Sequence, residues 1–419
     1  MDTAPVSQND RRLNRVICLP FPEEQYLRLV QDPQLFRKHL NKVFAQFPEL
    51  FPQEMTAGYQ MKDLRQSKKQ QLPLRRITIN RVPYTIRPSF LLPYMSGQVD
   101  QADSALFLRR FDVPFWALAR VFGRDEQYWY RLCHSLGRNS LVGTTIRDPQ
   151  RLPAHLNVDE KHSWNQGQKV YIATTVTQSC FLGMAVAPEA SEVALQQAYG
   201  KFREEAQQVC RTYQPQTVTT DGWEATQKAW KTLFPKTVLI LCFLHVFIKI
   251  RDRSQKKYKE AFQSVATRLW ECYQATTKAS FSQRVRRLQE WATQQNLPDV
   301  ILTPLSKLRE RLSTYAVAYD HPQAYRTSTP LDRLMQRMNQ HLCDTHYLHG
   351  DSDVAEQNLR GWALLYNFAP AHPATIKQHQ GWQSPAERLN QFRYHDHWLQ
   401  NLLISASLGG LRFAPPNPS

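Results

Sequence analysis

The stretch Leu156-Asn157-Val158-Asp159-Glu160-Lys161-His162 combines a short apolar strand with a pair of carboxylates. Runs of β-branched and apolar residues of strand length follow it, separated by segments with apolar residues at helical spacing. After this first strand we predict strand, strand, helix, strand, helix and strand, over residues 169–176, 180–186, 191–213, 217–221, 224–233 and 237–244. The expected order is therefore β-β-β-α-β-α-β.

Two aspartates hold related positions in this pattern, Asp159 on the first strand and Asp221 at the end of the fourth. A mixed sheet with this order brings the first and fourth strands together, so we expect the two to face each other although 62 residues (221 minus 159) separate them. Paired carboxylates repel unless a cation lies between them, which favours Mg²⁺ or Mn²⁺. Two such ions about 3.5–4 Å apart support phosphoryl transfer. The alternative, that each aspartate only caps a strand end, is favoured for one residue alone but not for the pair.

The composition indicates a polyanionic partner. The 419 residues are 42% hydrophobic, enough for two or three domains with cores, and carry a formal net charge of +17 with a pI of about 9.6. The seven cysteines are scattered singly, which argues against a disulfide framework and for a reducing cytosol. No apolar run has the length of a membrane span, and Met1 to Arg15 is polar, so we expect neither a signal peptide nor a membrane partner.

A basic segment lies between Lys62 and Arg87, where Asp63 is the single acid. Ile77, Ile79 and Val82 predict a strand whose antiparallel partner begins near Tyr84. A basic β-hairpin can follow a phosphate backbone. The candidate DNA-binding residues here are Lys68, Lys69, Arg75 and Arg76. A solvated basic surface without a ligand is the alternative for this segment.

The segment from Asp103 to Gly137 predicts three helices, over residues 105–111, 113–121 and 125–136. Phe122-Gly123-Arg124 interrupts the last two, as in a helix-turn-helix that offers its second helix to the major groove. The candidate DNA-binding residues are Arg124, Arg131 and Arg138. Packed helix pairs also occur in proteins that never bind DNA, and the net charge favours the DNA-binding interpretation.

Cys242-Phe243-Leu244-His245 follows the fifth predicted strand. Zinc would need two further ligands, which Cys343 and His346 could supply as a Cys₂His₂ set, but we favour a structural or strand-positioning role near Asp221 over zinc. Trp223 could stack on an unpaired base, although a tryptophan after a strand more often covers the core. Further basic candidates for DNA binding open the helical segment that follows: Lys249, Arg251, Arg253, Lys256 and Lys257.

Taken together, Asp159, Asp221-Gly222-Trp223, Cys242-x-x-His245, a helical insertion and the stretch Arg326 to Leu334 resemble the DDE transposases of bacterial insertion sequences. The resemblance is to the long-insertion class related to Mutator-like elements, and it covers roughly residues 154–370. It implies an RNase H-like core within a mixed α+β fold, two bound Mg²⁺ ions, cleavage of DNA at the ends of the element and joining of the freed 3′-hydroxyl to target DNA. It also implies a synaptic homodimer or larger oligomer, and a cytoplasmic location at the bacterial nucleoid.

In this family the third carboxylate lies on the helix after the insertion, and two residues compete for the position. Asp332 matches the local context, Asp-Arg-Leu in place of Glu-Arg-Leu. Glu356 has the usual residue type and a longer side chain, and it lies 135 residues (356 minus 221) beyond Asp221. We expect Glu356 to be the ligand and keep Asp332 as the alternative.

The predicted organisation has six parts: an N-terminal region with the hairpin, a helix-turn-helix segment, the first part of the core, the helical insertion, the closing helices of the core, and C-terminal helices with a tail, over residues 1–100, 101–150, 151–248, 249–325, 326–370 and 371–419. The expected function is an active transposase. The alternatives are an inactive, domesticated or decayed DNA-binding copy and an RNase H-like structure-specific nuclease.

Overall fold

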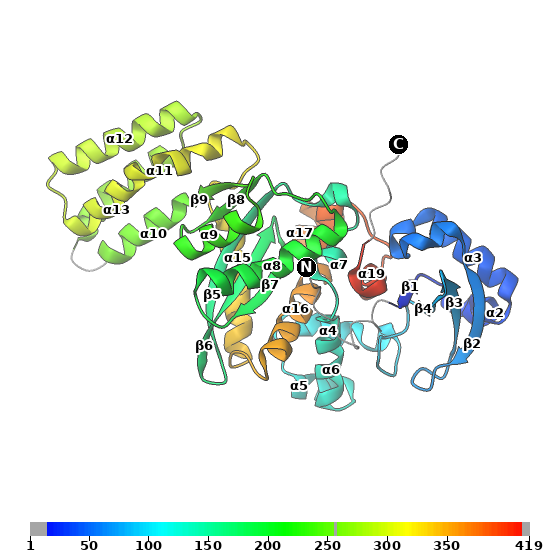
Figure 1. Ribbon diagram of the computed structural model, residues 1–419. Helices are drawn as coiled ribbons and strands as arrows, with labels where there is room; N and C mark the ends of the chain where they lie inside the picture. Colours follow the sequence, from blue (N-terminus) through cyan, green and yellow to red (C-terminus); the bar gives the residue numbers. More distant parts are fainter. Residues whose placement is uncertain (1–14, 255–257, 413–419) are drawn as a thin grey trace.

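The computed structural model describes residues 15–254 and 258–412, which form a mixed α+β structure with two mixed β-sheets. A five-stranded sheet lies in the middle of the molecule, a bundle of helices extends from one end of it, and the N-terminal sheet lies at the other end (Figure 1). In the described ranges, no helix has both the length and the apolar character that a membrane span requires.

The central sheet has the strand order β7-β6-β5-β8-β9. Its strands are β5 (His155–Asn165), β6 (Gln168–Thr177), β7 (Cys180–Ala187), β8 (Thr217–Thr220) and β9 (Val238–Leu241). The strands β5, β6 and β7 are antiparallel, and β8 runs parallel to both β5 and β9. The β5–β6 turn uses Gln166 and Gly167, both with positive φ, as a tight hairpin requires. The predicted element order and the neighbouring positions of the first and fourth strands are confirmed.

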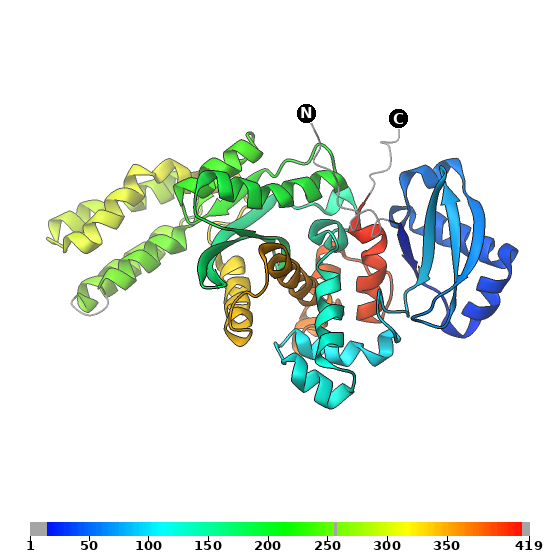
Figure 2. The same cartoon turned by 60° about the horizontal axis from the view of Figure 1, so that its bottom comes forward.

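Helices cover both faces of this sheet. One face packs on α8 (Glu192–Val209) and α9 (Glu224–Leu233), through residues that include Leu182, Phe202 and Trp230. The other face packs on α15 (Thr329–Asp344) and α16 (Ser352–Phe368), through residues that include Ile172 and Phe181. Figure 2 shows the two layers on either side of the strands. β5 and β6 are therefore buried from both sides where the carboxylates lie.

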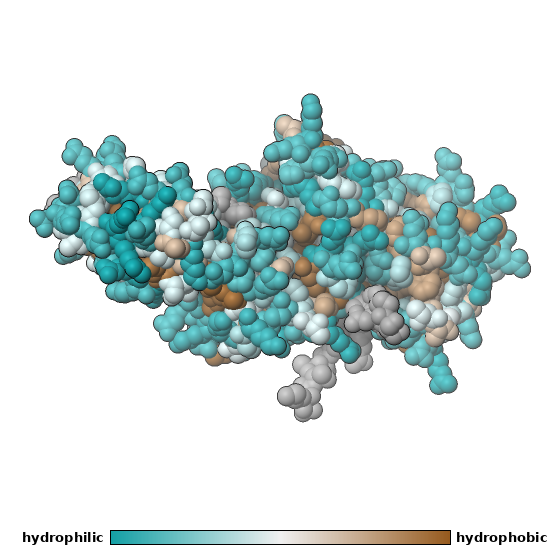
Figure 3. Space-filling model, turned by 90° about the horizontal axis from the view of Figure 1, so that it is seen from above, coloured by the Kyte–Doolittle hydropathy of each residue, from teal (hydrophilic) through white to brown (hydrophobic). Residues whose placement is uncertain are grey.

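A helical insertion follows β9 and has its own hydrophobic core. Its helices are α10 (Phe243–Ser254), α11 (Lys259–Tyr273), α12 (Lys278–Gln294), α13 (Asp299–Glu310) and α14 (Leu312–Ala316). The chain leaves it through Arg326, whose guanidinium lies over the rings of Tyr273 and Tyr319, at 4.5 and 4.4 Å from the ring centroids. The face seen in Figure 3 is mostly hydrophilic over the insertion, with hydrophobic side chains gathered towards the middle of the molecule.

The N-terminal region contains α2 (Glu23–Gln31), α3 (Pro33–Gln46) and a four-stranded sheet of order β1-β4-β3-β2. Its strands are β1 (Val16–Leu19), β2 (Gln60–Gln66), β3 (Pro73–Ile79) and β4 (Val82–Pro88). The antiparallel pairing of β3 with β4 confirms the predicted hairpin, but Val82, which we expected in the first strand, begins the second and pairs with Ile79.

The predicted helix-turn-helix corresponds to α5 (Phe115–Phe122) and α6 (Glu126–Leu136), preceded by α4 (Asp103–Arg109) and followed by α7 (Leu141–Thr145). The helices α6 and α16 cross closely at two glycines. A β-carbon at Gly361 would lie 2.5 Å from the carbonyl oxygen of Cys133, and one at Gly137 would lie 1.8 Å from that of Gln357. Only glycine permits this approach.

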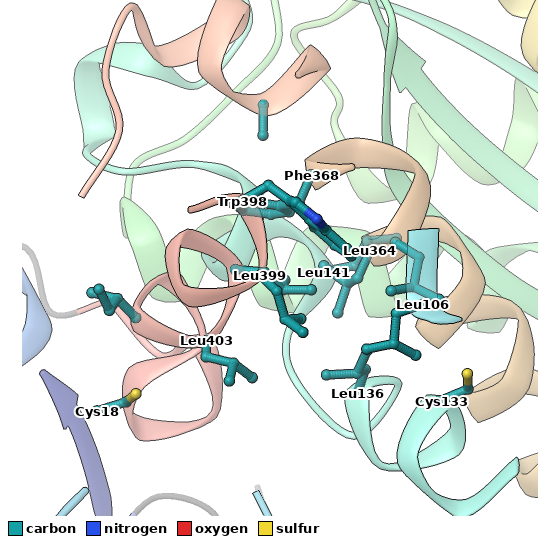
Figure 4. Close-up of a cluster of buried hydrophobic side chains, with 14 of the residues drawn as sticks. Cys18, Leu106, Cys133, Leu136, Leu141, Leu364, Phe368, Trp398, Leu399 and Leu403 are labelled. Carbon is teal, nitrogen blue, oxygen red and sulfur yellow. The ribbon is translucent and has the colours of Figure 1, made fainter. Parts of the chain in front are cut away.

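One hydrophobic cluster joins the N-terminal sheet, the helix-turn-helix segment, α16 and the C-terminal helices. The C-terminal helices are α17 (Pro373–Gln378), α18 (Pro385–Asn390) and α19 (Trp398–Ser405). In Figure 4, Leu399 and Leu403 of α19 lie between Cys18 of β1 and Leu136 of α6. These segments, which are distant in sequence, therefore share a core.

Candidate functional site

Asp159 on β5 and Asp221 directly after β8 lie beside each other across a pair of parallel strands. The pairing of β5 with β8 ends at Asn157 opposite Thr219. Two residues further along each strand, the same register places Asp159 beside Asp221, which follows the last residue of β8. Neighbouring strands lie about 4.8 Å apart. Beyond Asn157, β5 continues alone on this side, so the two carboxylates stand where the sheet opens.

The turn after β8 fixes the backbone around Asp221. The Oδ1 atom of Asp221 accepts a hydrogen bond from the backbone N–H of Trp223 at 2.8 Å. Between them, Gly222 has a φ of +94°, a conformation that favours glycine. The ring of Trp223 packs beside Tyr171, with centroids 5.8 Å apart, and contacts the core of the sheet. This position agrees with the core-covering role that we favoured for Trp223.

Asp332 lies in the first turn of α15, the helix that packs against β5. The hydroxyl of Ser328 donates to its carboxylate, at 3.0 and 3.1 Å from the two oxygens. Burial raises the pKa of Asp332, while Ser328 and the nearby charge of His245 oppose the increase. Asp332 in turn raises the pKa of Asp159. The structure therefore brings Asp332 into the electrostatic neighbourhood of Asp159 and His245.

Glu356 lies elsewhere. Its carboxylate accepts hydrogen bonds from Lys201 of α8 at 2.8 Å and from the backbone N–H of Val186 at 3.0 Å. Val186 is on β7, two strands away from β5, and two strand spacings amount to about 10 Å. The bonds to Lys201 and β7 hold Glu356, which we expected to complete the set, at the other edge of the sheet, so the structure favours the alternative, Asp332.

Cys242 connects the end of β9 to the start of α15. It is 1% exposed, and its thiol donates to the hydroxyl of Ser328 at 3.2 Å. The backbone N–H of Ser328 donates to the same sulfur at 3.1 Å. The motif therefore holds the residue that donates to Asp332, which agrees with the structural role that we favoured.

His245 adds a positive charge to this cluster. Burial opposes ionisation of both Cys242 and His245, but their mutual interaction outweighs it, lowering the pKa of the Cys242 thiol. The same interaction, with the charges of Asp159 and Asp221, raises the pKa of His245 to about 9. The Cys242 sulfur and the two carboxylates thus all favour the protonated form of His245.

The Cys₂His₂ alternative is wrong on geometry. Cys242 contacts Ser328 at the beginning of α15, whereas Cys343 is exposed near its end. A helical rise of about 1.5 Å per residue over the intervening 15 residues (343 minus 328) gives about 22 Å, far beyond the reach of one zinc ion.

Two neighbouring acids on β5, Asp159 and Glu160, have raised pKa values. Burial raises the pKa of Asp159, and the charge of Asp221 adds to the effect, bringing it to about 6. Glu160 points to the opposite side of β5, where Tyr199 and Thr226 donate to it at 2.7 and 2.6 Å. Burial raises the pKa of Glu160 to about 7 despite these two hydrogen bonds. Perturbation of this kind is common at functional sites.

The donor set fits a hard divalent metal, since it consists of carboxylate oxygens from three elements whose negative charges oppose one another. Within residues 15–254 and 258–412, no three His, Cys, Asp or Glu side chains lie close enough together to form a complete metal site as they stand. The structure thus brings Asp159 and Asp221 together by strand register and Asp332 into the electrostatic range of Asp159.

The predicted DNA-binding residues differ in their availability. Most are exposed: Lys68, Lys69, Arg124, Arg131, Arg138, Lys249, Arg251 and Arg253. Arg76 forms an ion pair with Asp63 of the neighbouring strand. Lys256 and Lys257 lie outside the described residues.

Arg75 is a correction to the predicted DNA-binding set. It is only 6% exposed, and its guanidinium donates to the backbone carbonyls of Val30 and Gln31 at the end of α2. The alternation of a strand explains the difference, since Arg76 on the other face is partly exposed. Arg75 is a structural residue of the N-terminal region.

Sequence reasoning also missed residues. Ser328 lies within the stretch Arg326 to Leu334, but nothing in the sequence connects it with Cys242, 86 residues away. Lys307 and Arg311 line a cavity beside Asp221. Their spacing of four residues on a predicted helix was a signal that they share a face.

Comparison with known proteins gives no match to any family model and none to a curated protein, so what can be said of function comes from this arrangement of residues.

Proposed function

We propose that the protein is a DDE-type DNA transposase with an RNase H-like core, which cleaves DNA at the ends of a mobile element and transfers the strand into target DNA. The observation that carries the proposal is the register of β5 and β8, which pairs Asn157 with Thr219 and, extended by two residues, puts Asp159 beside Asp221 where the sheet opens. Asp332, on the helix packed against β5, supplies the third carboxylate. The strand order β7-β6-β5-β8-β9 supports the choice of fold family, and so does the helical insertion that follows β9 along the chain.

In this proposal Asp159, Asp221 and Asp332 hold two Mg²⁺ or Mn²⁺ ions, which activate the attacking oxygen and stabilise the leaving one when bound. The chain's own residues set the geometry. The Trp223 N–H orients the Asp221 carboxylate, and Ser328 orients that of Asp332. The His245 imidazolium moderates the repulsion among the three acids. Exposed basic residues of the hairpin, α6 and α10 bind the DNA backbone, and two copies act together at paired ends.

A DNA-binding protein without turnover is the second candidate, and one observation favours it. Asp332 is one methylene shorter than the glutamate expected by resemblance, and the hydroxyl of Ser328 donates to its carboxylate. A side chain held in this way has less freedom to reach a ligand than a glutamate would. A structure-specific nuclease would share the carboxylates and differ only in lacking strand joining.

The test is to incubate the full chain with Mg²⁺ and DNA carrying the terminal sequences of the segment that encodes it. Joined products are expected. Cut but unjoined products would indicate a nuclease, and a shifted but uncut band a binding protein. Asp159→Asn, Asp221→Asn and Asp332→Asn should each abolish cleavage and leave DNA binding intact. Asp344→Asn, at the exposed end of the same helix as Asp332, is the matched control. Full cleavage by Asp159→Asn or Asp221→Asn would overturn the proposal.

A further inference from the structure

A cavity of about 190 Å³ lies between the helical insertion and the end of β8 where Asp221 follows the strand. Asp221 and His245 line one side of it. Its other walls come from α10 and α13, which pack against each other, and from the residues that follow α13. The cavity therefore opens directly beside one of the three carboxylates.

Four cations line this cavity. Lys249 and Arg253 are four residues apart on α10, and Lys307 and Arg311 are four residues apart on α13 and at its end. Residues at this spacing share one face of a helix. Each of the two helices therefore contributes a pair of cations to the lining of the cavity. A β-carbon at Gly222 would lie 3.9 Å from Nη1 of Arg311, which places that guanidinium against the turn that carries Asp221.

None of these four cations forms an ion pair with a carboxylate in the part of the chain that the structure describes. Surface lysines and arginines without partners are common, but four around one small cavity repel one another. In addition, the Nδ1 atom of His245 is buried without a hydrogen-bond partner among the described residues. The four unpaired cations point to an anion as the missing ligand, and the Nδ1 atom shows that the hydrogen bonding of this site is incomplete.

The cavity, of about 190 Å³, is large enough for a phosphate group and far too small for a duplex. Arginine binds phosphate through two parallel hydrogen bonds, and lysine binds it as a point charge. Because phosphate contacts position a nucleic acid without reading its sequence, a single phosphate seated here would fix the register of a strand relative to Asp221.

We propose that this cavity binds one backbone phosphate of the DNA strand being cut, next to the phosphate that is cleaved, with Lys307 and Arg311 as its ligands from the insertion. This inference rests on the proposed function and assigns the insertion a role in it. The insertion selects which phosphodiester reaches the carboxylates, and it does so from the side of Asp221.

The experiment uses the full chain and a set of short DNA duplexes that each carry one neutral methylphosphonate in place of one phosphate. Wild type should lose affinity at one position next to the cleavage site. Lys307→Gln/Arg311→Gln should be insensitive at that position and remain sensitive elsewhere. Its log affinity should also depend less steeply on log salt concentration, by about 0.9 for each duplex phosphate that the variant no longer neutralises. Arg286→Gln/Arg287→Gln, on the exposed face of α12, removes the same charge from the same insertion and is the matched control.

The outcomes separate the two proposals. If wild type does not cleave but the methylphosphonate effect depends on Lys307 and Arg311, the proposed function fails and the phosphate site stands. If the double variant keeps the sensitivity of wild type, or the control pair loses it equally, the phosphate site is overturned. An RNA duplex of the same sequence that depends more strongly on these two residues than DNA does would overturn the assignment to DNA. Thermal unfolding of each variant verifies that it is folded.

Discussion

The sulfur of Cys242 lies 3.2 Å from the hydroxyl of Ser328, which in turn donates to Asp332. A residue at the end of a strand is thereby connected, through one side chain, to a carboxylate on a helix beyond the insertion. Cys242→Ala should leave the buried N–H of Ser328 without its partner, which costs about 1–3 kcal/mol of unfolding free energy.

Cleavage should decrease more than DNA binding in Cys242→Ala, because Asp332 loses its orientation. Denaturant unfolding, cleavage rate and DNA affinity measured on one preparation check this prediction. Cys242→Ser, which retains a donor and acceptor, should recover part of the cleavage rate. Equal losses of binding and cleavage would contradict a positioning role.

Removing a charge from the site should stabilise the metal-free protein. Asp159 is ionised among other acids in a largely buried position, and its pKa of about 6 lies above the ordinary value for aspartate of about 3.9. We expect Asp159→Asn to raise the unfolding free energy at pH 7.5 by an amount on the order of 1 kcal/mol. Asp344→Asn, at an exposed position, should change it by less than about 0.5 kcal/mol.

The stability difference between wild type and Asp159→Asn should depend on pH with a definite sign. Because the folded chain has the higher pKa, it binds the proton more tightly than the unfolded chain does. The penalty from the ionised carboxylate is therefore complete above pH about 6 and disappears as the pH falls towards about 4. Urea unfolding at several pH values checks this, and a difference that grows at low pH would contradict it.

Divalent metal should raise the unfolding free energy of the wild-type protein, by an amount that increases with its affinity for the folded state. A ligand that binds only the folded state at 100 times its dissociation constant adds about 2.7 kcal/mol. We expect Mg²⁺ or Mn²⁺ to raise the melting temperature of wild type and to have little effect on Asp159→Asn/Asp221→Asn. The measurement is a thermal melt with metal against one with chelator. Equal shifts in both proteins would place the binding elsewhere.

Arg75 and Lys69 should respond in opposite ways. Arg75→Ala removes hydrogen bonds to the carbonyls of Val30 and Gln31, so it should destabilise the fold by about 1–3 kcal/mol. Lys69 is exposed in the turn between β2 and β3, where its ammonium donates to the carbonyl of Tyr94, so Lys69→Ala should weaken DNA binding at low salt and lower stability by less than about 1 kcal/mol. Denaturant melts and DNA titrations of both variants distinguish the two roles.

The crossing of α6 and α16 provides a test of the packing. Gly361→Ala places a methyl group 2.5 Å from a backbone carbonyl, which the helices can relieve only by separating, so a loss of about 1–3 kcal/mol or more is expected. Gly200→Ala, in the middle of α8 with nothing within 4 Å of the added carbon, should instead stabilise by about 0.4–1 kcal/mol.

Local patterns were sufficient for much of the fold. The β-branched runs located the strands of the central sheet, and their order required the first and fourth strands to be neighbours, as the pairing of β5 with β8 confirms. The hairpin of β3 and β4 followed from Ile77, Ile79 and Val82 in the same way. These features depend on periodicity and on the small number of ways to connect strands.

Long-range side-chain interactions could not be predicted from the sequence. Whether Glu356 reaches the other carboxylates depends on Lys201, 155 residues away, and on the free edge of β7. The burial of Arg75 depends on where α2 ends against the sheet. Neither interaction produces a periodic pattern in the sequence, because each depends on how whole elements pack and not on which residues are neighbours in the chain.

The guanidinium of Arg326, stacked between Tyr273 and Tyr319, has a mechanical consequence. The backbone carbonyl of the same residue accepts a hydrogen bond from the N–H of Phe243, so this interaction connects the beginning of the helical insertion with the segment that leaves it. Ser328 follows only two residues later. A displacement of the insertion would therefore also displace the beginning of α15, where Asp332 lies.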